Sequence, residues 1–181
     1  WETNPDAVES FADAPDHLSS TVKLKPGLKW QDGEPLTAED VRFSWQTIMD
    51  EQVPVPAVRS GTDQLADVQA IDPLTVRYVY KEVLATNKWN ISFPIIPKHI
   101  FGNPAERQKD PSLSKSDYFV KYNREGAVGS GPYKLVSWTA NDQIVFERWD
   151  GYTGRKWHFK KLIFKIQPDQ NTRLLFFKQG G

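Results

Sequence analysis

The hydrophobic period of this 181-residue chain changes along its length, and that change constrains the fold more than any other feature. Val41, Trp45, Ile48 and Met49 recur at the spacing of one helix face and predict a helix over residues 37–50. Elsewhere apolar residues alternate with polar ones, which is typical of half-buried strands. The alternating stretches are 21–24, 68–71, 75–80, 133–138, 143–148 and 160–166. The two periods together predict a mixed α/β fold of the α+β kind.

Turn and cap residues mark where these elements begin and end. Thr37 is suited to cap the helix, and Glu39 and Asp40 follow in the first turn, where the helix dipole favours negative charge. Gly33 can adopt the positive φ of a tight turn, and Asp72-Pro73 separates two strands as in a hairpin. These signals predict a strand, a turn, a helix and a hairpin in that order.

The remaining segments carry weaker signals. The first twenty residues are acidic and lack a period, so we expect irregular or edge structure there. Prolines interrupt residues 53–61 and polar residues dominate residues 102–116, which predicts a loop in each place. Residues 118–122 and 171–178 show helical patterns, the second after an aspartate that can cap it.

The composition restricts the class of protein. Leu, Ile, Val and Phe make up 45 of the 181 residues, above the roughly 20% below which charged chains stay disordered. The absence of cysteine excludes disulfides, thiol nucleophiles and metal sites that contain cysteine. No apolar run approaches the roughly 18 residues of a membrane-spanning helix. We therefore expect a globular chain without a transmembrane segment.

Charge is balanced overall but unevenly distributed. Residues 1–72 carry 14 acidic and 5 basic side chains, whereas residues 73–181 carry 9 acidic and 18 basic ones. A basic and aromatic run at residues 155–165 has the composition of a nucleic-acid patch. The alternation of residues 159–166 favours a half-buried strand with lysines on its solvated face. No nucleic-acid partner is expected.

No catalytic constellation is recognisable in the sequence. The glycines of residues 126–131 fit neither a phosphate loop nor a nucleophile elbow, so Ser130 is interpreted as a turn residue. His17, His99 and His158 lack the spacing of a zinc site, and His99 is expected to be a satisfied, buried imidazole. We therefore predict no enzyme activity, no metal site and no cofactor.

Aromatic residues are abundant, with 7 Trp, 6 Tyr and 10 Phe. Most are expected in the core, including Trp138 at a strand end. Trp1, Trp89, Trp149 and Trp157 remain surface candidates, and an exposed, flat array of Trp149 and Trp157 would indicate a carbohydrate-binding module.

Residues 24–45, LKPGLKWQDGEPLTAEDVRFSW, closely resemble the signature of the family 5 extracellular solute-binding proteins. Members of this family are the oligopeptide, dipeptide and nickel receptors of ABC importers. Further matches follow in the order of the family, at residues 70–76, 97–100, 129–135, 144–148 and 171–173.

The resemblance implies a fragment of a periplasmic-binding-protein-like fold. Residues 1–97 would form most of the small extra domain, and residues 98–181 would begin the first main lobe, truncated at its C-terminus. It also implies a periplasmic or extracellular location and ABC permease subunits as partners. The membrane association would run through the transporter or through a lipid anchor outside this fragment.

The implied function is capture of a small solute, a peptide, between two lobes for delivery to the permease. The loop after the Trp45 helix can reach the cleft between the lobes, so Pro56, Ala57, Val58 and Arg59 are the predicted ligand-binding residues. Arg59 either pairs with a peptide carboxylate or is a solvated loop arginine. The alternatives are a receptor of the same family for an oligosaccharide or nickel chelate, and a carbohydrate-binding module of a secreted protein.

Overall fold

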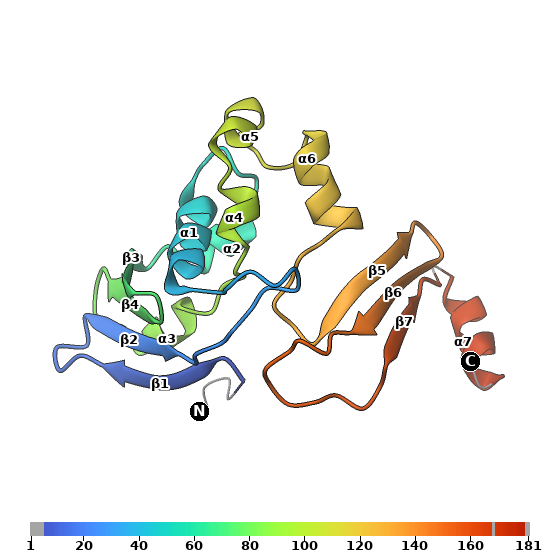
Figure 1. Ribbon diagram of the computed structural model, residues 1–181, viewed down its shortest axis with the longest axis horizontal. Helices are drawn as coiled ribbons and strands as arrows, with labels where there is room; N and C mark the ends of the chain where they lie inside the picture. Colours follow the sequence, from blue (N-terminus) through green and yellow to red (C-terminus); the bar gives the residue numbers. More distant parts are fainter. Residues whose placement is uncertain (1–5, 168, 180–181) are drawn as a thin grey trace.

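The computed structural model describes residues 6–167 and 169–179, whose elements fall into two units (Figure 1). We call residues 6–125 the N-terminal unit and the described residues from 126 onward the C-terminal unit. The elements of the N-terminal unit are β1 (Val8–Asp13), β2 (Ser19–Leu24), α1 (Ala38–Met49), α2 (Pro56–Ser60), β3 (Leu65–Asp72), β4 (Thr75–Tyr80), α3 (Asn87–Asn90), α4 (Lys98–Phe101), α5 (Pro104–Lys109), α6 (Asp117–Val120) and the π-helical turn η1 (Lys121–Glu125). Those of the C-terminal unit are β5 (Tyr133–Thr139), β6 (Gln143–Arg148), β7 (Lys161–Lys165) and α7 (Gln170–Lys178). The mixed α/β fold class is confirmed.

A four-stranded antiparallel sheet in the order β1-β2-β4-β3 carries the first hydrophobic core. Val22 pairs with Val76 across β2 and β4, so both side chains leave the same face of the sheet. Val41 of α1 and Leu65 of β3 belong to the same buried cluster, and each is 1% exposed. Trp30, from the turn before α1, completes the cluster and is also 1% exposed. The apolar stripe predicted for this helix therefore faces the core.

A second core lies where α4 and α6 approach α1. The rings of Phe101 and Phe119 stack with their centroids 5.7 Å apart, and Val53 belongs to the same cluster. This core joins residues on both sides of the boundary predicted between residues 1–97 and 98–181. That division stays a prediction, and the packing favours a change of unit after η1.

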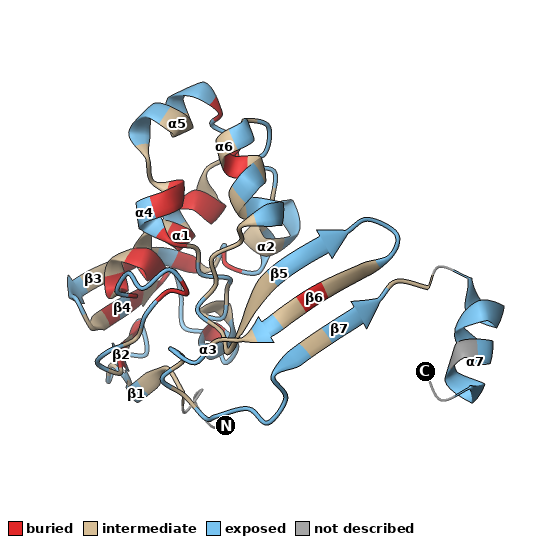
Figure 2. Cartoon of the chain, turned by 45° about the vertical axis from the view of Figure 1, so that its right-hand side comes forward, coloured by how far each residue is buried: buried red, intermediate tan, exposed pale blue. Residues whose placement is uncertain are grey.

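The C-terminal unit is a three-stranded antiparallel sheet in the order β5-β6-β7, followed by α7. Two rows of apolar side chains cross its strands: Trp138, Ile144 and Phe164, then Leu135, Phe146 and Leu162. Figure 2 shows that the buried residues gather in the N-terminal unit, whereas β5, β7 and α7 are largely exposed. The sheet therefore presents an apolar face on which Trp138 and Phe164 are exposed and the other four side chains are partly buried.

This exposure corrects two predictions. Trp138, which the sequence predicts in the core, is 52% exposed. The half-buried face predicted for residues 159–166 is wrong at Phe159 and Phe164, which are 69% and 56% exposed. The physical reason is that β5 and β7 are the two edge strands of a three-stranded sheet, so each has a neighbouring strand on one side only.

Two segments predicted as loops contain short helices. α2 begins at Pro56 and α5 begins at Pro104, and in both the proline occupies one of the first helical positions. A proline there loses no intrahelical hydrogen bond, because the first N–H groups of a helix have no partner within it. Asn103 caps α5 by accepting a hydrogen bond from Ala105 N at 3.1 Å. These prolines therefore start helices instead of interrupting the chain.

Candidate functional site

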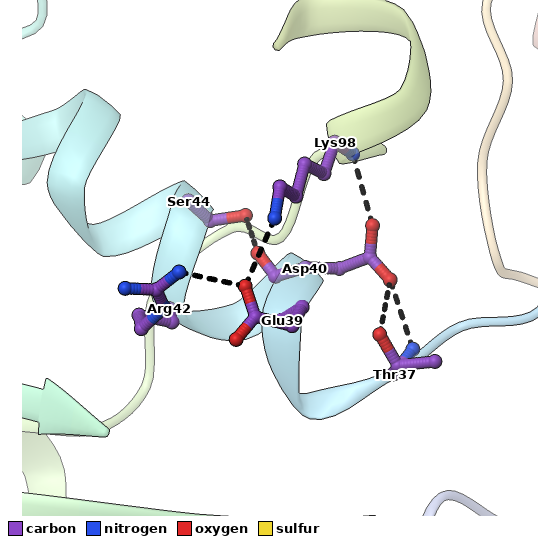
Figure 3. Close-up of polar contacts among 6 residues, drawn as sticks. All are labelled: Thr37, Glu39, Asp40, Arg42, Ser44 and Lys98. Atoms are coloured by element: carbon purple, nitrogen blue, oxygen red, sulfur yellow. Dashed lines mark hydrogen bonds and ion pairs between the residues drawn. The ribbon is translucent and has the colours of Figure 1, made fainter. Parts of the chain in front are cut away.

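The N-terminus of α1 is held to the chain around α4 by one carboxylate, that of Asp40 (Figure 3), and by one hydroxyl, that of Ser44. Asp40 Oδ2 accepts hydrogen bonds from Thr37 N at 2.8 Å and from Thr37 Oγ1 at 3.3 Å, and Thr37 is the N-cap as predicted. Asp40 Oδ1 accepts from Lys98 N at 2.9 Å. Ser44 Oγ donates to Asp40 O at 2.6 Å and accepts from Ile96 N at 2.8 Å. The start of α1 thus fixes the position of the segment that leads into α4.

Glu39 forms two ion pairs on the outer side of this turn. Its Oε2 lies 2.8 Å from Arg42 Nη2 and 2.9 Å from Lys98 Nζ. The hydrogen bond from Arg42, followed by that from Lys98, lowers the pKa of Glu39. Because the Glu39 side chain is 41% exposed, solvent screens these interactions. The arrangement is a solvated network at a helix start.

His99 lies close to the same turn and pairs with Asp32. His99 Nε2 is 2.7 Å from Asp32 Oδ2, so the imidazole has a partner, as predicted. The predicted burial is wrong, because the His99 side chain is 34% exposed. The pair bridges α4 and the turn that precedes α1 at the surface.

The C-terminal half of α1 borders an apolar cavity of about 270 Å³. Its walls come from α1, α2, α4 and the segments at residues 94–96 and 112–114. Ile48, Val53 and Val55 supply aliphatic surface on the side of α1 and α2. A concave, mainly apolar cavity with a few polar groups is the usual form of a small-molecule site.

The four predicted ligand-binding residues lie on α2, beside this cavity. Val58 lines the cavity, whereas Pro56 and Ala57 are exposed on the outer side of the helix. The structure therefore brings one of the four into the cavity wall. Their role as ligand contacts stays a prediction.

Arg59 has a structural role that neither sequence interpretation foresaw. Its Nε donates to Ile48 O at 2.8 Å, and its Nη2 donates to Asp50 O and Val53 O, each at 2.7 Å. These carbonyls lie at and beyond the end of α1, where a helix leaves carbonyl groups without partners. The arginine therefore holds the chain that leaves α1 against α2 and shapes one side of the cavity.

Gln31 joins the two units of the molecule and was not singled out from the sequence. It is 7% exposed, and its Nε2 donates to Gly131 O at 2.9 Å and to Tyr133 O at 2.7 Å. Its Oε1 accepts from Gly129 N at 3.1 Å, and its backbone N donates to Gly129 O at 2.9 Å. Lys134 Nζ donates to the carbonyl of Gln31. One residue thus binds the turn before α1 to the segment that enters β5.

The tryptophans proposed as a sugar platform do not present bare rings. Lys134 Nζ lies over the Trp149 ring, 5.3 Å from its centroid. The guanidinium of Arg155 lies over the Trp157 ring at 5.0 Å, and Tyr133 meets the same ring edge-on. Each ring has a cation against one face, which argues against a flat array for stacking on sugars.

Residues 6–167 and 169–179 carry neither a metal-ligand group nor a membrane-spanning helix. Over that range, no three His, Cys, Asp or Glu side chains are grouped closely enough to hold a metal ion. None of the helices in the same range has both the length and the apolar character needed to cross a bilayer.

The chain is similar in sequence and in structure to known solute-binding proteins. Residues 2–181 match the family model described as "Bacterial extracellular solute-binding proteins, family 5 Middle". The oligopeptide-binding protein AppA of Bacillus subtilis is 28% identical over 176 residues, which cover 96% of this chain and 31% of AppA. The solved structure of AppA in complex with a nonapeptide aligns with a TM-score of 0.75 and 27% identity, over 96% of this chain and 33% of that one.

A second solved structure also aligns with nearly the whole of this chain. The ABC transporter substrate-binding protein CtaP of Listeria monocytogenes aligns with a TM-score of 0.78 and 34% identity, over 97% of this chain and 34% of that one. The chain therefore spans about a third of the length of the proteins it matches.

Proposed function

The chain belongs to family 5 of the bacterial extracellular solute-binding proteins, and on that premise we propose that it is part of the solute receptor of an ABC importer. In this function the receptor captures a small solute between two lobes and delivers it to the membrane permease. The observation that carries the proposal is the family match, which extends over residues 2–181.

A peptide is the solute we propose. AppA, which resembles this chain over 96% of this chain and 33% of AppA, was solved with a nonapeptide. The apolar cavity beside α2 suits the side chains of a peptide better than the hydroxyl-rich surface of a sugar. A nickel chelate and an oligosaccharide remain the competing solutes of the same family.

Within this function, α2 would contribute to the ligand site. Pro56, Ala57, Val58 and Arg59 are our proposed contact residues, with Val58 at the cavity wall and Arg59 fixing the backbone of the loop. A ligand that touches both lobes stabilises the closed state by its differential affinity for that state. Such a receptor binds and releases its solute without chemical turnover.

The proposed setting is the periplasm or the outer cell surface, with the permease subunits as protein partners. The N-terminal unit would correspond mainly to the small extra domain and the C-terminal unit to the first main lobe. The sequence placed this boundary after residue 97, and we propose the later position after η1, because the second core spans residue 97.

A thermal-shift screen tests the proposed function. The longest natural form of the protein that contains this chain is heated with peptides, oligosaccharides and nickel chelates in parallel. A ligand at about 100 times its Kd should stabilise the protein by about 2.7 kcal/mol. Stabilisation by peptides supports the proposal. Stabilisation by oligosaccharides or nickel chelates instead would show that the receptor binds that class of solute and not peptides. Stabilisation by none of them contradicts the receptor function.

A further inference from the structure

The cavity beside α2 has a lining that defines what it can hold. Its apolar lining includes Ile48, Val55, Ile96, Phe101 and Leu113. Among the described residues that line the cavity, none carries a charge. From these features we infer that the cavity is a subsite for one uncharged, apolar group, such as a leucine, methionine or phenylalanine side chain. That this group belongs to a captured peptide rests on the proposed function.

Polar side chains in the wall already donate hydrogen bonds within the protein. Ser112 Oγ donates to Asp110 Oδ1 at 2.5 Å, and Asn123 Nδ2 donates to Leu113 O at 3.0 Å. Ser44 Oγ is bonded to a backbone carbonyl of α1, as described above. A polar guest that accepts from one of these three side chains would have to displace such a bond, whereas an apolar guest leaves them intact.

The neighbouring arginines offer little to an anionic guest. Arg59 is engaged by three carbonyls. Arg107 Nη2 lies 2.8 Å from Asp50 Oδ2, and Arg107 Nη1 donates to Thr47 Oγ1 at 3.3 Å. A carboxylate or ammonium group in the cavity would be desolvated without a counterion, which is strongly unfavourable. The cavity therefore selects against charged side chains.

The size of the cavity suits one large side chain. Its volume of about 270 Å³ exceeds the roughly 150 Å³ of an engineered apolar cavity that holds benzene. A phenylalanine or leucine side chain fits such a space. The cavity thus defines one position of a longer ligand.

Benzene is the probe for the first test, because it reports on the cavity without any assumption about transport. In methyl NMR spectra, benzene should shift the methyl signals of Ile48, Val58 and Ile96. The signals of Leu65 and Val76, in the other core, should stay unchanged as internal controls. Shifts spread evenly over both cores, or no shift, overturn the inference.

A substitution that fills the cavity provides a control for the benzene test. Val58→Trp should occupy the space and abolish the benzene shifts, whereas Ile71→Trp, at a 57% exposed position, should leave them unchanged. Far-UV circular dichroism and the unfolding midpoint show whether each variant folds. Val55→Phe, which fills the same cavity with a smaller change, replaces Val58→Trp if that variant is unfolded. Benzene shifts that persist in a folded, filled variant overturn the inference.

The second test uses tripeptides that differ in one side chain. Peptides with leucine or phenylalanine should bind about tenfold or more tightly than those with aspartate or lysine, and Val58→Trp should remove this preference. An equal affinity across the series overturns the inference while leaving the proposed function intact. Benzene bound in the cavity of a protein that binds no peptide supports the subsite and contradicts the proposed function alone.

Discussion

The two sheets of the molecule share one sequence pattern and differ in what covers them. In the four-stranded sheet, Val68 and Val76 are 1% and 0% exposed, because they belong to the core that α1 closes. In the three-stranded sheet, Trp138 and Phe164 are 52% and 56% exposed. Alternation therefore identifies the side chains that share a face, and tertiary packing decides whether that face is buried.

The units also differ in how they are held. Two apolar cores stabilise the N-terminal unit, whereas its junction with the C-terminal unit is largely polar. It comprises the hydrogen bonds of Gln31 and those that Asp6 accepts from Tyr152 Oη and Arg155 N. Val128, in the connecting segment, packs against both cores. Apolar contact is non-directional, but a buried amide needs every partner in place. The junction thus fixes the orientation of the second sheet.

The largest effect is expected from truncation in the covered sheet. Leu65→Ala should lower the free energy of unfolding by about 2–5 kcal/mol, because it leaves a cavity in the first core. Ile163→Ala, at a 54% exposed position of β7, should change it by about 0.5 kcal/mol or less. Urea denaturation measures both. Equal losses would show that the second sheet is covered in solution.

Gln31→Leu should have the next largest effect. It leaves the carbonyls of Gly131 and Tyr133 and the amide of Gly129 without their partner, at an expected cost of about 1–3 kcal/mol. Unfolding followed by tryptophan fluorescence and by far-UV circular dichroism should then give separate transitions for the two units. Gln46→Leu, on the exposed side of α1, is the matched control. A single, unshifted transition in Gln31→Leu would refute this account of the junction.

Arg59→Ala tests the hydrogen bonds of Arg59 to backbone carbonyls within the N-terminal unit. Loss of its bonds to three carbonyls should cost about 1–2 kcal/mol. Arg59→Lys keeps the charge but cannot span the three acceptors, so it should recover only part of the loss. If Arg59→Ala weakens ligand binding without any change in urea midpoint, the arginine acts on the ligand directly.

The smallest effect concerns the exposed charges at the start of α1. Because Arg42 and Lys98 lower the pKa of Glu39, this carboxylate stabilises the folded state above its unfolded pKa of about 4.3. The contribution should be lost as the pH falls through the lower, folded pKa. Glu39→Gln should cost less than about 1 kcal/mol at pH 7 and nothing at low pH, with a further decrease at high salt. Unfolding measured from pH 3 to pH 7 decides this, and a cost that is independent of pH would contradict it.

Much of the fold was predictable, because its signals are local. The helix after Thr37, the hairpin at Asp72-Pro73 and the three C-terminal strands follow from period and cap residues within a few positions. The helices at Pro56 and Pro104 were missed, because proline signals a break and a helix start with the same residue.

The candidate site was less predictable, because its contacts are distant in sequence. Ile48, Val58 and Leu113 line the same cavity, and no local sequence pattern predicts that residues so far apart in the chain share a site. The partners of Arg59 are backbone carbonyls, which look alike at every position of a sequence. The resemblance of residues 24–45 to a family indicated the function but not which side chains shape the cavity.

The separation between Gln31 and its partners bears on how the protein is made. The hydrogen bonds of Gln31 span 98 to 102 residues of chain. At a synthesis rate of about 5–20 residues per second, its side chain waits roughly 5–20 s before Gly129 and Tyr133 exist. During that interval the N-terminal unit can assemble its first core, whose buried residues end at Tyr80, while the amide of Gln31 is hydrated. Docking of the second sheet onto the N-terminal unit therefore follows assembly of the first core during synthesis.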